Sequence, residues 1–161
     1  MQAFAGQQVQ QSQVLYYLIL GPHLVEAASK AGVAVSRSIT RQIGGEPAVR
    51  ALVDRFYDLM DLEPGYAALR AVHGSTLDDA RQKLFWFLCG WLGGPSYYTD
   101  RFGHPRLRMR HMPFRIGIRE RDQWLACMDQ AMGEVAVPAE LRERLRQSFF
   151  QTADWMRNVG A

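Results

Sequence analysis

Residues 103–114, GHPRLRMRHMPF, contain a histidine that lies between two prolines. Pro105 suits the first position of a helix, because its fixed φ fits there and its missing N–H is not needed. Pro113 cannot continue a helix and pushes the residue before it out of the helical region. The prolines leave room for about two turns, in which Leu107 and His111 share one face. A short helix with an imidazole at its end suits a metal ligand, but it also suits a histidine that bonds a backbone carbonyl.

Upstream of this stretch, the spacing of apolar residues predicts a helix that opens at Pro47. Its predicted buried residues are Val49, Leu52, Val53, Phe56 and Met60. Pro64 starts a short helical turn, and Ser75 or Thr76 then caps the next helix, because their hydroxyls can accept from first-turn N–H groups. Residues 84–92 are apolar nearly all round, which predicts a buried helix.

Two further helices are expected downstream, one over about residues 119–132 and one that opens at Pro138. Their predicted buried residues are Trp124, Met128, Met132, Leu141, Leu145, Phe149 and Met156. Near the start of the chain, residues 14–42 predict one or two helices. No stretch alternates with the period of a strand, so the sequence predicts an all-α fold whose helices pack around something central.

Length and composition favour a single globular domain, since the chain has 161 residues of which 48% are hydrophobic. Cys89 and Cys127 lie inside apolar helical patterns, which predicts buried free thiols in a reducing compartment. No apolar run approaches the ~20 residues of a membrane-spanning helix. Residues 1–13 carry no Lys or Arg, which disfavours a signal peptide and leads us to expect a cytoplasmic protein.

Several motifs, taken in order, resemble the truncated haemoglobins, and specifically their group II. They are Arg55-Phe56-Tyr57, residues 83–88 running to Gly93-Gly94-Pro95, residues 103–114, and Glu120-Arg121-Asp122-Gln123-Trp124. The resemblance covers roughly residues 40–156. It implies a truncated globin domain, a two-over-two helical sandwich, at 39–161. A partly helical N-terminal extension is expected at 1–38.

The resemblance implies haem b as the cofactor and His111 as the proximal iron ligand. On the distal side, Tyr57 and Trp124 match the tyrosine and tryptophan of group II, and His73 matches a position that varies in this family. The remaining expected distal residues are Ala80, Leu84 and Phe87. From the residues alone, Tyr57 and Trp124 also read as core. His73 could donate to a ligand, face solvent or bind the iron.

The resemblance also implies contacts between the protein and the haem edge, where two propionates need cations or donors. The expected cofactor contacts are Lys83, Tyr98, His104, Leu107, Arg110 and Phe114. The planar guanidinium of Arg110 suits a carboxylate, although the charged members of this set also suit a solvated surface. The basic run over residues 101–115 does not predict nucleic-acid binding, because no aromatic interleaving or recognition-helix pattern supports it.

Three functions remain open. The first is reversible binding of oxygen, with carbon monoxide and nitric oxide as further ligands. The second is a redox enzyme, a nitric oxide dioxygenase or peroxidase, which would need a separate reductase because the chain has no dinucleotide-binding fingerprint. The third is a haemless helical interaction module. Hydrogen bonds to a charged ligand are worth about 1.5–3 kcal/mol each, so a donor-rich pocket would release oxygen slowly.

We expect a monomer or homodimer, the latter through residues 16–19.

Overall fold

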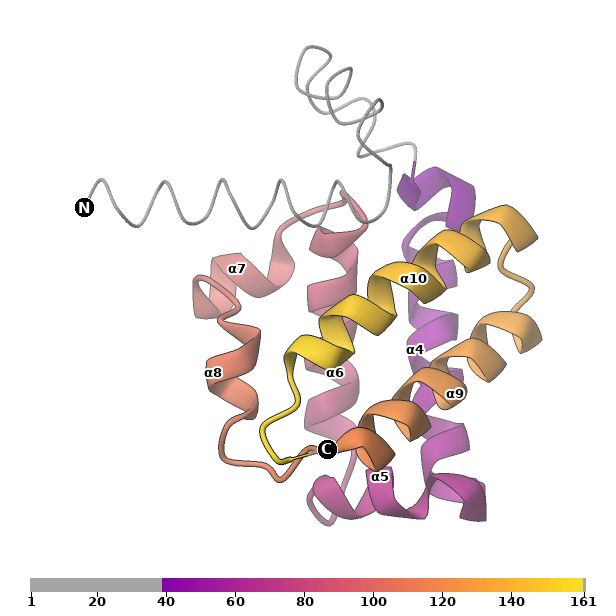
Figure 1. The fold of residues 1–161 in the computed structure, drawn as a ribbon. Helices are drawn as coiled ribbons and strands as arrows, with labels where there is room; N and C mark the ends of the chain where they lie inside the picture. Colours follow the sequence, from indigo (N-terminus) through magenta and orange to yellow (C-terminus); the bar gives the residue numbers. More distant parts are fainter. Residues whose placement is uncertain (1–38, 161) are drawn as a thin grey trace.

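The computed structural model describes residues 39–160, which form helices joined by short connections (Figure 1). After a helical segment at 39–43, the elements are α4 (Gly45–Leu62), η1 (Pro64–Tyr66), α5 (Ala67–Val72), α6 (Asp78–Trp91), α7 (Tyr97–Phe102), α8 (Leu107–His111), α9 (Ile118–Glu134) and α10 (Ala139–Trp155). The expectations for residues 1–38, including a helical extension and dimerisation through residues 16–19, lie outside the described residues.

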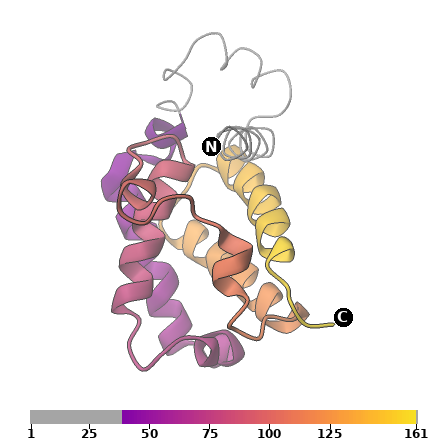
Figure 2. The same ribbon diagram turned by 90° about the vertical axis from the view of Figure 1, so that its left-hand side faces the viewer.

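Four long helices form two layers. α4 and α6 lie side by side in one layer, and α9 and α10 form the other (Figures 1 and 2). α4 also packs against α9, which joins the layers. The short helices α7 and α8 lie at one edge of the sandwich, beside α6 (Figure 1). This arrangement confirms the predicted all-α, two-over-two fold for the described part of the chain.

The predicted apolar face of α4 supplies much of the core between the layers. Val49, Leu52, Val53, Phe56 and Met60 are all buried, as the helical spacing predicted. Each large apolar side chain contributes about 1.5–3 kcal/mol when fully buried. Met128, Met132, Leu141, Leu145 and Phe149 of α9 and α10 are buried as well, also as predicted.

Other burial predictions were wrong. Trp124 is only half-buried. Its ring contacts the rings of Phe56 and Phe149 and packs against the core cluster from outside, so part of it stays exposed. Met156 is also half-buried, because α10 has already ended at Trp155. Residues 84–92 are buried in part: five of these side chains are buried, and Leu84, Trp86, Phe87 and Gly90 are half-buried.

The start of α6 differs from the prediction. Its N-cap is Leu77, and no side chain caps it, so neither Ser75 nor Thr76 plays that role. The preceding loop is instead held by Arg70, whose guanidinium donates to the backbone carbonyls of Gly74 at 2.7 Å and Ser75 at 3.1 Å. A side chain from α5 therefore holds this loop, where a cap at Ser75 or Thr76 was expected.

The helix between the two prolines is shorter than predicted. It spans Leu107–His111, and Pro105 lies before it rather than in its first turn. The reason is a local turn, in which the N–H of Arg106 donates to Nδ1 of His104 at 3.0 Å and Arg106 adopts a left-handed φ of 44°. Met112 keeps helical angles, with φ −57° and ψ −34°, so the prediction that Pro113 displaces it was wrong.

α7 was not predicted, because six residues are too few to show a helical period. It follows a tight turn at Gly94, whose N–H donates to the carbonyl of Cys89 at 2.8 Å. Cys89 and Cys127 are free and buried, as predicted. Within residues 39–160, none of the helices is both long and apolar enough to span a bilayer.

Candidate functional site

The histidine of α8 is held in one orientation by its own helix. Nδ1 of His111 lies 2.6 Å from the carbonyl oxygen of Leu107, one turn earlier. A carbonyl only accepts hydrogen bonds, so Nδ1 carries the proton and Nε2 of the neutral ring keeps its lone pair. His111 is half-buried. This is the hydrogen-bond arrangement that prepares a histidine to ligate a metal through Nε2.

Tyr57 of α4 and His73, which follows α5, form an aromatic pair. Their ring centroids are 6.0 Å apart in an edge-to-face arrangement. Tyr57 is buried, and burial raises the pKa of its hydroxyl far above the usual value, against a smaller opposing effect of Arg81. The hydroxyl therefore stays protonated and can donate a hydrogen bond.

His73 is oriented in the same way as His111. Its Nδ1 donates to the carbonyl oxygen of Leu69 at 3.0 Å. Burial lowers the pKa of His73 below its usual value, the bond to Leu69 opposes this shift, and the charges of Arg70 and His111 lower the pKa further. The neutral ring thus presents Nε2 as an acceptor, and His73 has a second N–H donor only when it is protonated.

The expected apolar residues lie on α6 and α9. Trp124 of α9 contacts Phe56 of α4, at 5.3 Å between ring centroids. Ala80, Leu84 and Phe87 are half-buried and pack against the core cluster from α6. The structure thus places the Tyr57 and His73 rings side by side, and Phe56 contacts both Tyr57 and Trp124.

The expected cofactor-edge residues come together in part. Arg110 of α8 lies over the rings of Tyr98 at 5.7 Å and Phe102 at 6.0 Å, and it donates to the backbone carbonyl of Phe102 at 3.3 Å. Lys83 of α6 lies 5.6 Å from the Phe102 ring and pairs with Asp79 at 3.0 Å. Three elements therefore meet around Phe102.

Phe102 was missed by the sequence reasoning, because it ends a helix that was not predicted. His104 forms no hydrogen bond with the Lys83, Tyr98 and Arg110 group. Its Nδ1 accepts from the N–H of Arg106 in its own turn. Leu107 is half-buried on α8, and Phe114 is exposed in the loop after it, where its N–H donates to the carbonyl of His111.

A flat, ring-shaped metal cofactor fits this set of residues. No group of three or more His, Cys, Asp or Glu side chains able to hold a metal ion occurs between residues 39 and 160. The oriented imidazole of His111 suits a metal that needs one protein ligand, apolar side chains suit a macrocycle, and the Lys83, Tyr98 and Arg110 group suits carboxylates at its edge.

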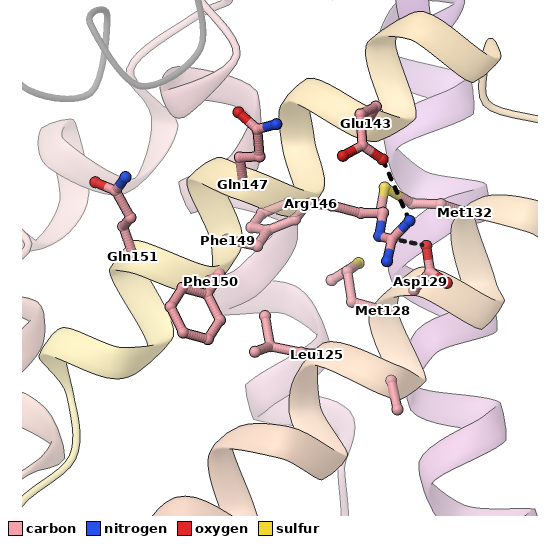
Figure 3. A pocket seen from close by; sticks show the side chains of 11 residues that line it. Leu125, Met128, Asp129, Met132, Glu143, Arg146, Gln147, Phe149, Phe150 and Gln151 are labelled. Carbon is pink, nitrogen blue, oxygen red and sulfur yellow. Dashed lines mark hydrogen bonds and ion pairs between the residues drawn. The ribbon is translucent and has the colours of Figure 1, made fainter.

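A groove of about 660 Å³ lies elsewhere, between α9 and α10 (Figure 3). Its floor includes Leu125, Met128 and Phe149, and Arg146 crosses it to pair with Glu143 and Asp129. No predicted site residue lines this groove.

Known proteins match most of the chain. Residues 38–158 match the family described as bacterial-like globin. Over 114 residues, the chain is 40% identical to a group 2 truncated haemoglobin of Bacillus subtilis strain 168, covering 71% of this chain and 84% of that protein.

Solved structures are similar over the same region. A cold-adapted truncated haemoglobin from the Antarctic marine bacterium Pseudoalteromonas haloplanktis matches with a TM-score of 0.73 and 43% identity, covering 75% of this chain and 98% of the other. The group II 2-on-2 haemoglobin of the plant pathogen Agrobacterium tumefaciens matches with a TM-score of 0.73 and 43% identity, covering 74% and 93%.

Proposed function

Because this chain belongs to the bacterial-like globin family, whose members bind oxygen through haem, we propose that His111 holds the iron of haem b and that Tyr57, His73 and Trp124 form its ligand side. The observation that carries this proposal is the 2.6 Å bond between His111 Nδ1 and the Leu107 carbonyl. That bond leaves Nε2 as the ligating atom and raises its basicity. The haem iron, when bound, supplies the position at which a diatomic ligand is held.

On the distal side, Tyr57 is the main hydrogen-bond donor to the ligand. Its raised pKa keeps the hydroxyl protonated at every physiological pH. Trp124 offers its indole N–H as a second donor. Neutral His73 accepts through Nε2, so it orients the Tyr57 hydroxyl or contacts the ligand only after protonation. Leu84 and Phe87 form apolar walls that exclude water from this side, and the small side chain of Ala80 leaves the haem edge open.

At the cofactor edge, Arg110, Tyr98 and Lys83 bind the propionates. Arg110 and Lys83 already converge on Phe102, so their cationic groups are close enough to serve one planar molecule. Lys83 also forms an ion pair with Asp79, whose side chain is more exposed than that of Lys83. Breaking this pair to bind a propionate costs little, because a surface ion pair is worth only about 0–1 kcal/mol. His104 is the remaining propionate contact, and Leu107 and Phe114 complete the contacts to the cofactor.

A redox enzyme is the second candidate, and the number of donors favours it. Two neutral donors, Tyr57 and Trp124, slow the release of oxygen, which suits a reaction with nitric oxide better than delivery. A haem held by these residues would have to be reduced again after each such reaction, so a separate electron-donor protein would be needed. Nitric oxide and carbon monoxide are expected as further ligands, in a cytoplasmic protein.

Absorption spectra of the full chain with added haem test the proposal. We expect a haem Soret band in the wild-type protein, and its loss or a large shift in His111→Ala. Tyr66→Phe is the control, because the Tyr66 hydroxyl donates to Gln130 at 2.6 Å and none of the proposed haem contacts takes part in that bond. A colourless protein, or an unchanged spectrum in His111→Ala, would contradict the proposal.

Mixing the oxygen-bound protein with nitric oxide separates the two candidates. Fast, stoichiometric formation of nitrate supports the enzyme. Slow or absent nitrate leaves oxygen binding as the better description.

A further inference from the structure

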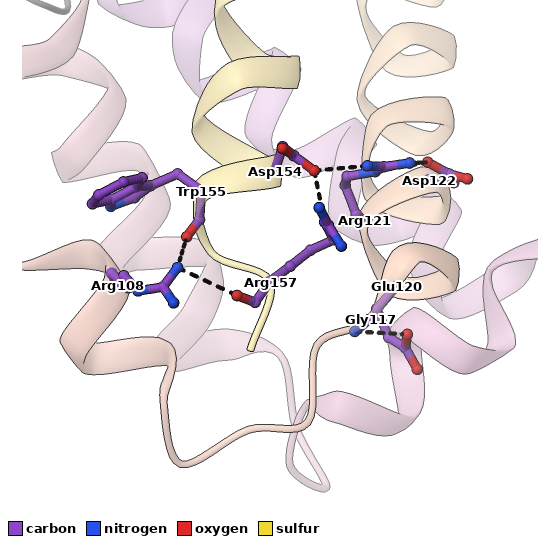
Figure 4. A network of polar contacts seen from close by, with 8 residues as sticks. All are labelled: Arg108, Gly117, Glu120, Arg121, Asp122, Asp154, Trp155 and Arg157. Atoms are coloured by element: carbon purple, nitrogen blue, oxygen red, sulfur yellow. Dashed lines mark hydrogen bonds and ion pairs between the residues drawn. The ribbon is translucent and has the colours of Figure 1, made fainter. Parts of the chain in front are cut away.

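The end of the chain is tied to the segment that carries His111. After α10 ends at Trp155, residues 156–160, here called the C-terminal tail, run along the loop between α8 and α9 (Figure 4). The N–H groups of Asn158 and Val159 both donate to the carbonyl of Ile116 in that loop, at 2.9 Å and 3.3 Å. The tail therefore pairs with the loop through its backbone.

The side chain of Asn158 reaches further, to α8 itself. Its Nδ2 donates to the carbonyl oxygens of His111 at 3.1 Å and Phe114 at 2.6 Å. Its Oδ1 accepts from the N–H of Ile116 at 2.9 Å. One amide thus bonds three backbone groups, including the carbonyl of the proposed iron ligand.

This arrangement requires an amide in one orientation. Both Nδ2 hydrogens face carbonyls and Oδ1 faces an N–H, so a flipped amide or a carboxylate would set oxygen against oxygen. Asn158 is the only asparagine in the sequence. No other residue type of similar size supplies two donors and an acceptor on one planar group.

A second tie joins α8 to the same tail. Arg108 donates to the backbone carbonyls of Trp155 and Arg157 (Figure 4). The side chain of Arg157 pairs with Asp154 at 2.6 Å, and Asp154 also pairs with Arg121 of α9 at 2.7 Å. These ion pairs anchor the tail to α9 before it reaches α8.

α8 depends on such ties, because none of its residues is buried. Helices whose apolar face enters the core are oriented by packing, but on α8 Leu107 and His111 are only half-buried. The arginines of α8 lie over the rings of Trp155, Tyr98 and Phe102. Its hydrogen bonds to neighbouring elements run from Arg108 to the tail, from Arg110 to the carbonyl of Phe102, and from Asn158 to the His111 carbonyl.

Resting on the proposed role of His111 as iron ligand, we propose that Asn158 is a positioning residue for it. By holding the His111 carbonyl from the C-terminal tail, the Asn158 amide fixes the end of α8 and hence the angle at which the imidazole meets the cofactor. The tail thereby becomes part of the proximal side, although it is 47 residues away in the sequence.

The test is Asn158→Asp in the full-length, haem-loaded protein, because aspartate has almost the same shape but no donors. Two readouts are taken from the same samples. The first is the iron–histidine stretching band in the resonance Raman spectrum of the ferrous, ligand-free form. The second is amide hydrogen exchange over residues 107–116, which does not depend on haem. We expect the band to move or broaden and exchange to rise about 10-fold or more, as the loss of two hydrogen bonds implies.

Arg142→Ala is the control, because it breaks the pair with Asp129 that joins α9 to α10 and touches neither α8 nor the tail. We expect it to leave the band unchanged even where it lowers the melting temperature. Should Asn158→Asp not fold, Arg108→Gln removes the second tie and takes its place.

The outcomes separate the inference from the proposed function. The inference is supported if the band is lost in His111→Ala, shifts in Asn158→Asp and stays unchanged in Arg142→Ala. An unchanged band and unchanged exchange in Asn158→Asp overturn it, and so does an equal shift in Arg142→Ala. A band that survives in His111→Ala overturns the proposed function instead.

Discussion

Removing one hydroxyl from Tyr57 tests the distal side most directly. Tyr57→Phe keeps the ring, which is 5% exposed and packs edge-to-face against Phe56 at 4.9 Å and His73 at 6.0 Å. No cavity larger than one oxygen atom forms, so the core should be preserved. The change therefore isolates the donor that the raised pKa of Tyr57 keeps protonated.

The size of the effect follows from the hydrogen bond that is lost. A hydrogen bond to a charged acceptor contributes about 1.5–3 kcal/mol, and 1.4 kcal/mol corresponds to a factor of ten. We expect oxygen to dissociate about 10 to 150 times faster from Tyr57→Phe. The proposed second donor, Trp124, is unchanged in this variant, so the lower end of this range is the expected value.

Stopped-flow displacement of oxygen by carbon monoxide measures the rate. Tyr66→Phe is the matched control, because the Tyr66 hydroxyl donates to Gln130 at 2.6 Å, and none of the proposed ligand-side residues takes part in that bond. An unchanged rate in Tyr57→Phe would refute the assigned role, and so would an equal acceleration in Tyr66→Phe.

Three further predictions concern the fold. Burial raises the pKa of the Cys127 thiol to about 12 and that of the Cys89 thiol to about 11, so maleimide should label neither in the native protein at pH 7.5, as mass spectrometry would show; rapid labelling would contradict this burial. Two arginine partners lower the pKa of Asp154, so its stabilising effect is present above the unfolded pKa of about 3.9 and is lost as the pH falls through the folded pKa. Asp154→Asn should therefore lower the melting temperature at pH 7 but have little effect near pH 2, and equal losses at both would argue against the ion pairs. Gly94→Ala would place a Cβ 2.9 Å from the Cys89 carbonyl oxygen and should cost about 1–3 kcal/mol in denaturant unfolding, whereas Gly90→Ala, with 3.6 Å to its nearest neighbour, should cost less.

The sequence predictions succeeded where an interaction leaves a repeating pattern along the chain. The five residues predicted to be buried on α4 are all buried, because helical periodicity reports one face over several turns, although Leu59 is buried as well and was not predicted. The predicted cap of α6 was wrong although the contacts are close in sequence, because Arg70 bonds the carbonyls of Gly74 and Ser75 and such a single contact leaves no repeating pattern. α7 escaped prediction because six residues show no period, and Phe102 was missed with it.

For the candidate site, local pattern and resemblance pointed to His111, Tyr57, His73 and Trp124, but not to how they are held. The bond from His111 Nδ1 to Leu107 lies within one helical turn, so spacing alone could suggest it. The half-buried state of Trp124 depends on rings from α4 and α10, and these meet only in the folded chain.

By itself, then, the sequence determined the longer helices, most of the apolar face that joins their layers and the short segment that presents His111. These depend on contacts a few residues apart, which periodicity and prolines encode. Only the tertiary structure decided that Asn158 bonds the His111 carbonyl and that Arg110 and Lys83 converge on Phe102. Those contacts join distant parts of the chain through single side chains, and a single side chain leaves no pattern along the sequence.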